Sequence, residues 1–161
     1  MLQVGTATKD MKRATDRWAE ILGATPPQMP TRESQWIFRG EVSNAKLKAA
    51  FVPFGDMEVE MVSSETDGSN LFLEFLNQRG NGVQHFAFSV DNMQEAIKHF
   101  ADFGIPVAMV SATPPDPSRP NNDTHLMDSR EKLGVDVELF HRVTCCDRDP
   151  LTFNGRLRPM N

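Results

Sequence analysis

Two segments of the chain alternate apolar with small or polar residues, and a helical pattern follows each of them. The first segment is Leu2–Thr8 and the second is Val83–Val90, and a period of two predicts strands. Apolar residues then recur at helical spacing up to Gly23 in the first half and up to Gly104 in the second. The remaining patterns predict strands at Gln35–Phe38, Lys46–Phe54, Glu58–Val62, Ile105–Val110, His125–Met127 and Val135–Phe140, a loop at 24–34, a turn at Gly40–Asn44 and a short helix at Leu71–Leu76.

The two halves match in sequence as well as in order. At an offset of 82 residues, the first predicted strand falls on the later one so that Gln3 coincides with His85. At an offset of 78 residues, the acidic strand Glu58–Val62 coincides with Asp136–Phe140. Recurrence of a strand, a capped helix and an acidic strand in the same order indicates a duplication.

The repeat predicts an α+β fold built from two tandem βαβββ modules. Residues 1–80 form the first module, residues 81–143 form the second, and residues 144–161 form a C-terminal extension. A single unit has an open sheet edge and an apolar helix face, so pairing two units buries both. We expect the paired modules to form a curved, open, barrel-like sheet around a metal-binding cleft.

Pseudo-symmetry would bring four polar residues together in that cleft. They are Gln3, Glu60, His85 and Glu138, which provide an amide oxygen, two carboxylates and an imidazole. Taken one at a time, each is more simply a hydrogen-bonded or solvated residue. Their repeat-related positions favour a site for a divalent metal ion such as Zn, Ni, Co, Mn or Fe.

Composition limits the partners of the chain. A net charge of −5 over 161 residues disfavours nucleic acid and anionic membranes as main partners. No apolar run approaches the roughly 20 residues of a membrane helix. Cys145 and Cys146 are the only cysteines, and adjacent cysteines rarely bridge each other, so we expect reduced thiols in a cytoplasmic protein.

A group of basic residues surrounds the last predicted hairpin. His125, Arg130 and Lys132 could hold a substrate phosphate or carboxylate, although an exposed basic turn is an equal alternative. Phe140 shares the face of Glu138 by alternation, so we expect it to line the substrate site.

Four stretches carry a resemblance to the vicinal oxygen chelate superfamily, and the likeness extends from about Leu2 to His141. This superfamily includes glyoxalase I, methylmalonyl-CoA epimerase, ring-cleaving dioxygenases and bleomycin-resistance binders. The closest overall likeness is to the epimerases, but their first strand supplies a histidine where this chain has Gln3. A glutamine at that position is instead similar to one branch of glyoxalase I. The four stretches are Val4–Asp10, Phe51–Gly55, Gly82–Val90 and Leu133–Leu139.

The resemblance implies a metal-dependent isomerase or lyase. A metal-bound carbonyl compound, such as an acyl thioester or a thiohemiacetal, would lose and regain a proton at its α-carbon through an enolate. Glu138 is the expected base, and Glu60 is the second choice. The second acid/base residue of the epimerases falls near Ser43 or Asn44 here, which argues against a two-base epimerase. A homodimer is also implied, with modules paired within the chain or across the dimer.

The alternative function is a non-catalytic protein of the same fold that binds a small molecule, as resistance members do. Those binders usually lack the complete ligand set, which this chain retains, so an enzyme is favoured. An Fe(II) dioxygenase would prefer two histidines and one carboxylate, and Gln3 argues against it.

Overall fold

The computed structural model describes residues 3–23, 31–32, 35–54, 57–111 and 123–141. The predicted extension at 144–161, with both cysteines, lies outside these residues. Among the described helices, none has the length and apolar character needed to cross a membrane. The elements in chain order are β1 (Gln3–Ala7), α1 (Met11–Leu22), β2 (Thr31–Arg32), β3 (Trp36–Phe38), β4 (Glu41–Ser43), β5 (Leu47–Phe54), β6 (Met57–Ser64), α2 (Leu71–Arg79), β7 (Gly82–Ser89), α3 (Met93–Asp102), β8 (Val107–Ser111), β9 (Asp123–Met127), α4 (Arg130–Leu133) and β10 (Asp136–His141).

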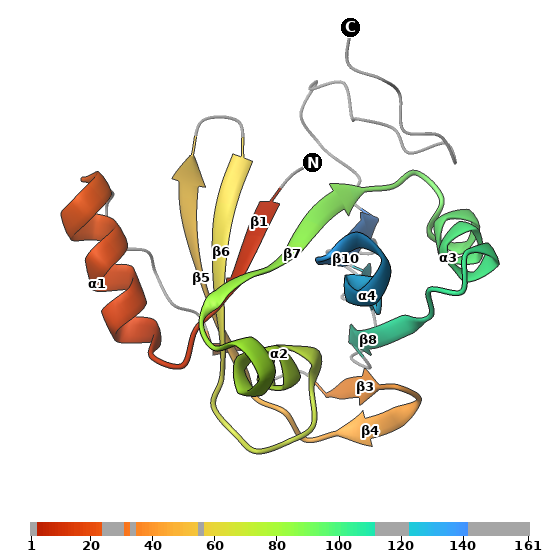
Figure 1. Ribbon diagram of the computed structural model, residues 1–161, viewed down its shortest axis with the longest axis horizontal. Coiled ribbons are helices and arrows are strands. Elements are labelled where there is room, and N and C mark those ends of the chain that lie inside the picture. The colour runs from red at the N-terminus through yellow and green to blue at the C-terminus, as the bar shows by residue number, and fades with distance from the viewer. Residues whose placement is uncertain (1–2, 24–30, 33–34, 55–56, 112–122, 142–161) are drawn as a thin grey trace, which may run out of the picture.

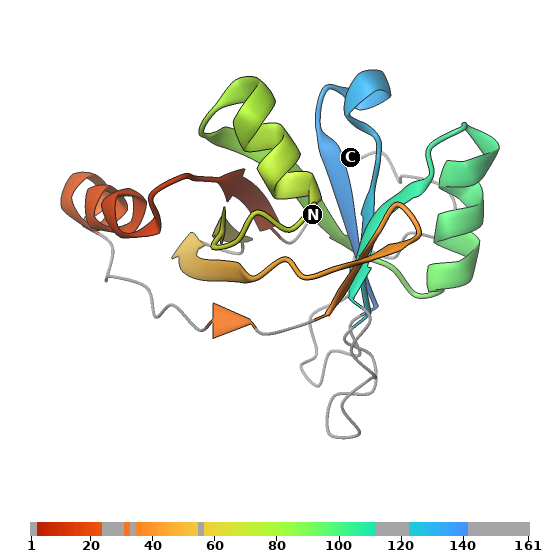
Figure 2. The same cartoon turned by 90° about the horizontal axis from the view of Figure 1, so that it is seen from below.

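All ten described strands belong to one sheet, in the order β2-β5-β6-β1-β7-β10-β9-β8-β3-β4. The sheet curls strongly into an open half-barrel, with α1 and α3 at its two flanks (Figure 1, Figure 2). Strands β1 and β7, one from each half, pair at its centre. The prediction of an α+β fold with a curved open sheet is confirmed.

The hairpin of β3 and β4 corrects two local predictions. The expected turn at Gly40–Asn44 is largely strand β4, because the chain already reverses at Arg39 and Gly40, which both have positive φ. The hairpin then pairs through β3 with β8 of the second half. In the first half it is β2 that pairs with β5, and β2 lies in the predicted loop 24–34. Strands of two or three residues are too short to show a periodic pattern.

In the first half, β1 runs parallel to β6. Gln3 lies opposite Glu58, and Gly5 lies opposite Glu60. The apolar residues of β6 alternate between the two faces of the sheet, so that Val62 joins the core under α2 while Met61 packs under α1.

In the second half, β7 runs parallel to β10 in the equivalent register. His85 lies opposite Asp136, and Ala87 lies opposite Glu138. These pairs follow the offsets of 82 and 78 residues rung by rung. The register therefore supports the division into two modules, which we retain as a proposal.

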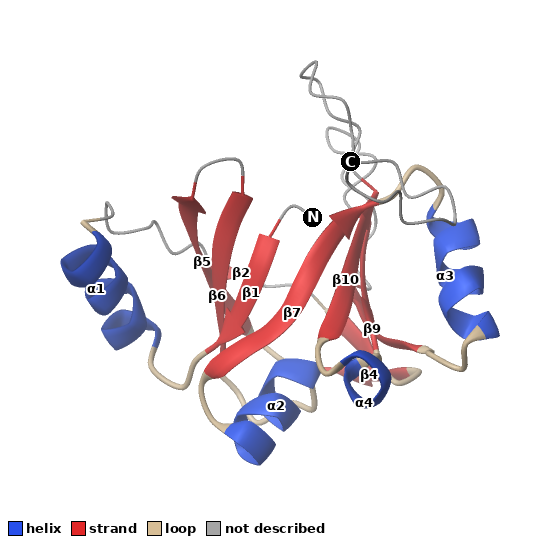
Figure 3. Cartoon of the chain, turned by 45° about the horizontal axis from the view of Figure 1, so that its top comes forward, coloured by secondary structure: helices blue, strands red, loops and turns tan. Residues whose placement is uncertain are grey.

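The two faces of the sheet pack against different helices (Figure 3). We call the face that packs against α2 the inner face, where α2 buries Leu71, Phe72, Phe75 and Leu76. The outer face packs against α1 in the first half and against α3 in the second. A capping side chain begins each outer helix, Asp10 for α1 and Asn92 for α3.

Candidate metal centre

The centre of the sheet holds a histidine directly over a glycine. Strands β1 and β7 are antiparallel, and Gly5 lies opposite His85. A Cβ atom at Gly5 would come within 1.8 Å of Cε1 and 2.1 Å of Nε2 of the His85 ring, far inside van der Waals contact. Small residues on this face were interpreted as room for a substrate. At Gly5, the space is filled by the imidazole itself.

Two carboxylates converge on the same histidine. The Nε2 atom of His85 lies 3.2 Å from Oε2 of Glu60 and 2.9 Å from Oε2 of Glu138. One donor atom from each of the three residues fits within 4.8 Å of the others. All three side chains are buried, His85 completely. Although Nε2 is close to both oxygens, it makes no well-directed hydrogen bond to either.

The charges of this cluster suit a divalent cation. Burial lowers the pKa of His85, but Glu138 and Glu60 outweigh burial and raise that pKa from 6.5 to about 10. A protonated His85 balances only one of two buried carboxylates. Buried charge is costly unless it is paired. A divalent cation would replace the proton on Nε2 and balance both carboxylates.

Gln3 supplies an amide oxygen on the neighbouring strand. Its Nε2 donates to Oε2 of Glu58 at 2.8 Å, which fixes the orientation of the amide. Its Oε1 is buried and has no hydrogen-bond partner among the described residues. A buried amide oxygen without a donor is suited to coordinate a cation, so Gln3 also fits the expected ligand set.

Gln84 holds His85 in one tautomer. The β1–β7 register shifts next to Gly5, so Gln84 has no partner on β1, and it is fully buried beside His85. The Gln84 Nε2 donates to Oδ2 of Asp136 at 2.7 Å, while its Oε1 lies 2.7 Å from Nδ1 of His85. Since a carboxylate only accepts, the amide oxygen must face His85 and accept from Nδ1–H. In neutral His85 the lone pair on Nε2 therefore faces the carboxylates, as metal ligation requires.

Arg130 fixes the other end of this chain of hydrogen bonds. The Nε atom of Arg130 donates to Oδ2 of Asp136 at 3.1 Å, and its terminal NH2 group makes a further close contact there. Its backbone N–H donates to Oδ1 of Asp136 at 3.1 Å, and its guanidinium lies 5.1 Å from the ring of Phe75. Arg130 is therefore committed to Asp136.

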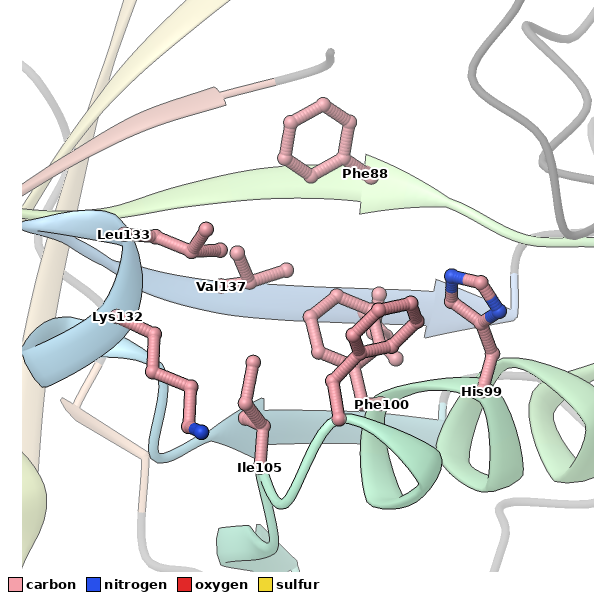
Figure 4. A pocket seen from close by; sticks show the side chains of 9 residues that line it. Phe88, His99, Phe100, Ile105, Lys132, Leu133 and Val137 are labelled. Atoms are coloured by element: carbon pink, nitrogen blue, oxygen red, sulfur yellow. The ribbon is translucent and has the colours of Figure 1, made fainter.

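The structure separates the other predicted substrate-binding residues. On β9, Leu126 belongs to the inner core, whereas His125 lies opposite Leu139 of the outer core. Lys132 also lies on the outer side, beside α3 (Figure 4). Of the four, only Phe140 shares the inner face with Glu138 by strand alternation. The four were grouped from closeness in sequence, which does not determine the face.

No described acid occupies the expected second acid/base position. Ser43 is buried, and its hydroxyl donates to the carbonyl oxygen of Ser69 at 2.6 Å. Glu41 is exposed at the end of the β3–β4 hairpin. The carboxylates of the centre are thus left as the candidates for proton transfer.

Sequence reasoning missed the residues that orient the ligands. Glu58 and Asp136 lie in the matched acidic strands, and the offset that identified Glu60 and Glu138 applies equally to them. Gln84 had no such signal, because its burial depends on an irregularity in strand pairing.

Known proteins resemble the chain in family and fold. The family model described as the Glyoxalase/Bleomycin resistance protein/Dioxygenase superfamily matches residues 2–122. No curated protein matches.

Solved structures with the same fold include two epimerases. Methylmalonyl-CoA epimerase from Mycobacterium tuberculosis is 18% identical over 89% of this chain and 87% of its own, with a TM-score of 0.60. The enzyme from Streptomyces coelicolor, solved with 2-nitronate-propionyl-CoA, is 16% identical over 89% of this chain and 94% of its own, at 0.61. A hypothetical protein from Bacillus halodurans is 16% identical over 92% and 97%, at 0.64. At these identities, the likeness shows the fold alone.

Proposed function

Because the chain belongs to the glyoxalase, bleomycin resistance protein and dioxygenase superfamily, we propose that it is a metal-dependent isomerase or lyase that moves a proton next to a carbonyl group. The observation that carries the proposal is the buried cluster of Glu60, His85 and Glu138 on the inner face. A protein that only sequesters a small molecule has no need to bury two carboxylates around a histidine, because burial of charge costs stability.

We assign four ligands to one divalent ion, with its identity open among Zn, Ni, Co, Mn and Fe. His85 would bind through Nε2, Glu60 and Glu138 through a carboxylate oxygen, and Gln3 through Oε1. The bound ion would supply Lewis-acid stabilisation of the charge that develops on the carbonyl oxygen. Gln84 and Glu58 would keep His85 and Gln3 in their binding orientations.

Glu138 is the proposed base, with Glu60 as the second choice. Both carboxylates are buried next to His85, so either could take a proton from a substrate carbon held at the inner face. Phe140, two residues beyond Glu138 on the same face, would contact the substrate. Because neither Ser43 nor Glu41 provides a second acid there, one carboxylate would both remove and return the proton.

The substrate class follows from the same chemistry. An acyl thioester and a thiohemiacetal both carry an acidic hydrogen next to a carbonyl carbon. Structural neighbours include methylmalonyl-CoA epimerases, one of them solved with 2-nitronate-propionyl-CoA. The reaction is therefore epimerase-like on an acyl-CoA, or glyoxalase I-like on a glutathione adduct. We also propose a cytoplasmic homodimer, on the sequence arguments above.

Hydrogen exchange at carbon tests this function. Protein loaded with Ni, Co, Mn or Zn is incubated in D2O with a 2-methylacyl-CoA, and separately with the methylglyoxal–glutathione adduct. Deuterium at the α-carbon is followed by mass spectrometry. We expect exchange or conversion with one substrate, lost with a chelator and in His85→Ala, and unchanged in Glu95→Gln, which alters an exposed acid on α3. Tight metal binding without any exchange would favour the sequestering alternative.

A further inference from the structure

The outer face of the second half carries a pocket that the metal centre does not use. It lies between α3 and strands β7 and β10 and has a volume of about 410 Å³ (Figure 4). Small-molecule pockets typically occupy about 300–1,000 Å³ and are mostly apolar. The apolar side chains around this pocket include Phe88, Phe100, Phe103, Ile105, Leu133 and Val137.

Strand alternation separates the pocket from the metal centre. Val137 and Leu139 line the pocket, whereas Glu138 between them turns to the inner face. A molecule in the pocket would therefore contact the back of β10 and could not reach His85 through the sheet.

The two polar side chains of the pocket differ in role. Lys132 and His99 lie at opposite ends of it, with Val137 between them (Figure 4). The His99 ring packs edge-to-face on Phe103, with centroids 5.2 Å apart, so it is part of an aromatic wall.

Lys132 is exposed and has no ion pair within the part of the chain that the structure describes. Its Nζ lies 3.6 Å from where a Cβ of Gly104 would be, at the turn that follows α3. Its ammonium group also lies near the C-terminal end of that helix, where a positive charge is favourable. The pocket thus combines an apolar wall with one cation at one end.

We propose that this pocket binds a medium-chain monocarboxylate, with the alkyl chain along Val137 and Phe100 and the carboxylate paired with Lys132. The alkyl chain gains free energy by leaving water, and the apolar lining offers it no competing polar group. A single carboxylate matches the single ammonium group, whereas a second charge would meet apolar walls. This site is independent of the proposed metal chemistry.

Calorimetric titration of the full chain with decanoate, below its micelle concentration, tests the site. Decanol serves as the neutral analogue. We expect saturable binding of one decanoate per chain, and about tenfold weaker decanoate binding in Lys132→Met, as expected for loss of one charge-assisted contact. Decanol binding should stay within about twofold in that variant, because the lost contact involves only the carboxylate.

Two further variants separate the head group from the chain. Phe103→Ser should weaken decanoate and decanol by a similar factor, because it removes apolar contact area from the wall. Lys98→Met removes another exposed lysine of α3, which pairs with Asp102, and should change neither affinity.

Three results would overturn the proposal. One is the absence of saturable binding for both compounds, and another is equal loss of both affinities in Lys132→Met. The third is a dimer that Phe103→Ser dissociates while neither compound binds, because Phe103 and Leu133 are 61% and 55% exposed and would then cover an interface between copies.

Discussion

The two halves of the centre hold equivalent residues in the same register, but they orient their ligands differently. In the first half, the amide of Gln3 donates directly to Glu58. In the second half, His85 reaches Asp136 only through Gln84. An amide has a fixed donor and a fixed acceptor, so one hydrogen bond determines which atom faces the centre. An imidazole has two nitrogens that share a movable proton, so its partner must itself be fixed.

The difference gives each acidic strand a division of roles. The first acid of each strand, Glu58 or Asp136, orients the ligand on the paired strand. The second acid, Glu60 or Glu138, faces the centre itself. Substitution of equivalent residues in the two halves tests this division.

The largest difference is expected between Glu138→Gln and Glu60→Gln. If Glu138 is the base, its amide variant should lose about 10²–10⁴-fold in α-proton exchange at saturating metal, the range of a general base. Glu60→Gln should mainly weaken metal binding and recover activity when metal is added. Single-turnover exchange measured over a range of metal concentrations separates the two effects. The reverse pattern would assign the base to the first half.

The pair Gly5 and Ala87 tests the packing of the two halves. Gly5→Ala places a methyl group inside the His85 ring, so it should lower the free energy of unfolding by about 1–3 kcal/mol and abolish stoichiometric metal binding. Ala87 lies opposite Gln3 as Gly5 lies opposite His85. Ala87→Gly should cost only about 1 kcal/mol and keep the metal. Denaturant unfolding and metal titration measure both, and full metal binding by Gly5→Ala would refute the arrangement.

The orienting acids should differ by a smaller factor. Asp136→Asn should weaken metal binding about 10–100-fold, as loss of a residue that orients a ligand typically does. It also weakens the contact of Arg130 with the centre. Glu58→Gln should have a smaller effect, because a glutamine can still accept from Gln3. Metal affinity by competition with a chelator gives the ranking, and equal affinities for wild type and Asp136→Asn would remove the role assigned to Gln84.

The pH dependence provides the smallest effect, which only the second half should show. The pKa of His85 is raised to about 10 in the folded metal-free protein, so its stabilising contribution is complete below 6.5 and is lost as the pH rises toward 10. The slope should reach at most about 1.4 kcal/mol per pH unit. His85→Gln, which makes this half resemble the first, should remove it. Denaturant unfolding of metal-free protein between pH 6 and 10 measures the slope, and a wild-type slope that persists in His85→Gln would place the titration elsewhere.

Much of the fold follows from local pattern. The helices capped by Asp10 and Asn92 and the long strands β5 and β7 carry strong periodicity, so their existence was predictable. The β3–β4 hairpin was not, because its strands have three residues each and join the sheet through β8 in the other half. Long-range pairing of such short strands leaves no local signal.

The site divides in the same way. Repeat offsets led to Gln3, Glu60, His85 and Glu138 because duplication conserves register along a strand, and the structure brings the last three together. Clustering in sequence failed for Lys132 and His125, because alternation turns neighbouring residues to opposite faces. Gln84 was beyond reach, since a shift in pairing between two distant strands buries it.

A crystal structure of the cobalt-loaded protein, with anomalous data at the cobalt edge, tests the central claim most directly. We predict one ion per chain, bound at about 2.0–2.2 Å by Nε2 of His85 and by oxygens of Glu60, Glu138 and Gln3, the usual range for such ligands. Gln84 should still accept from Nδ1 of His85. An ion bound elsewhere, or a centre that stays closed by the pairing of His85 with the two carboxylates at saturating cobalt, would contradict the account.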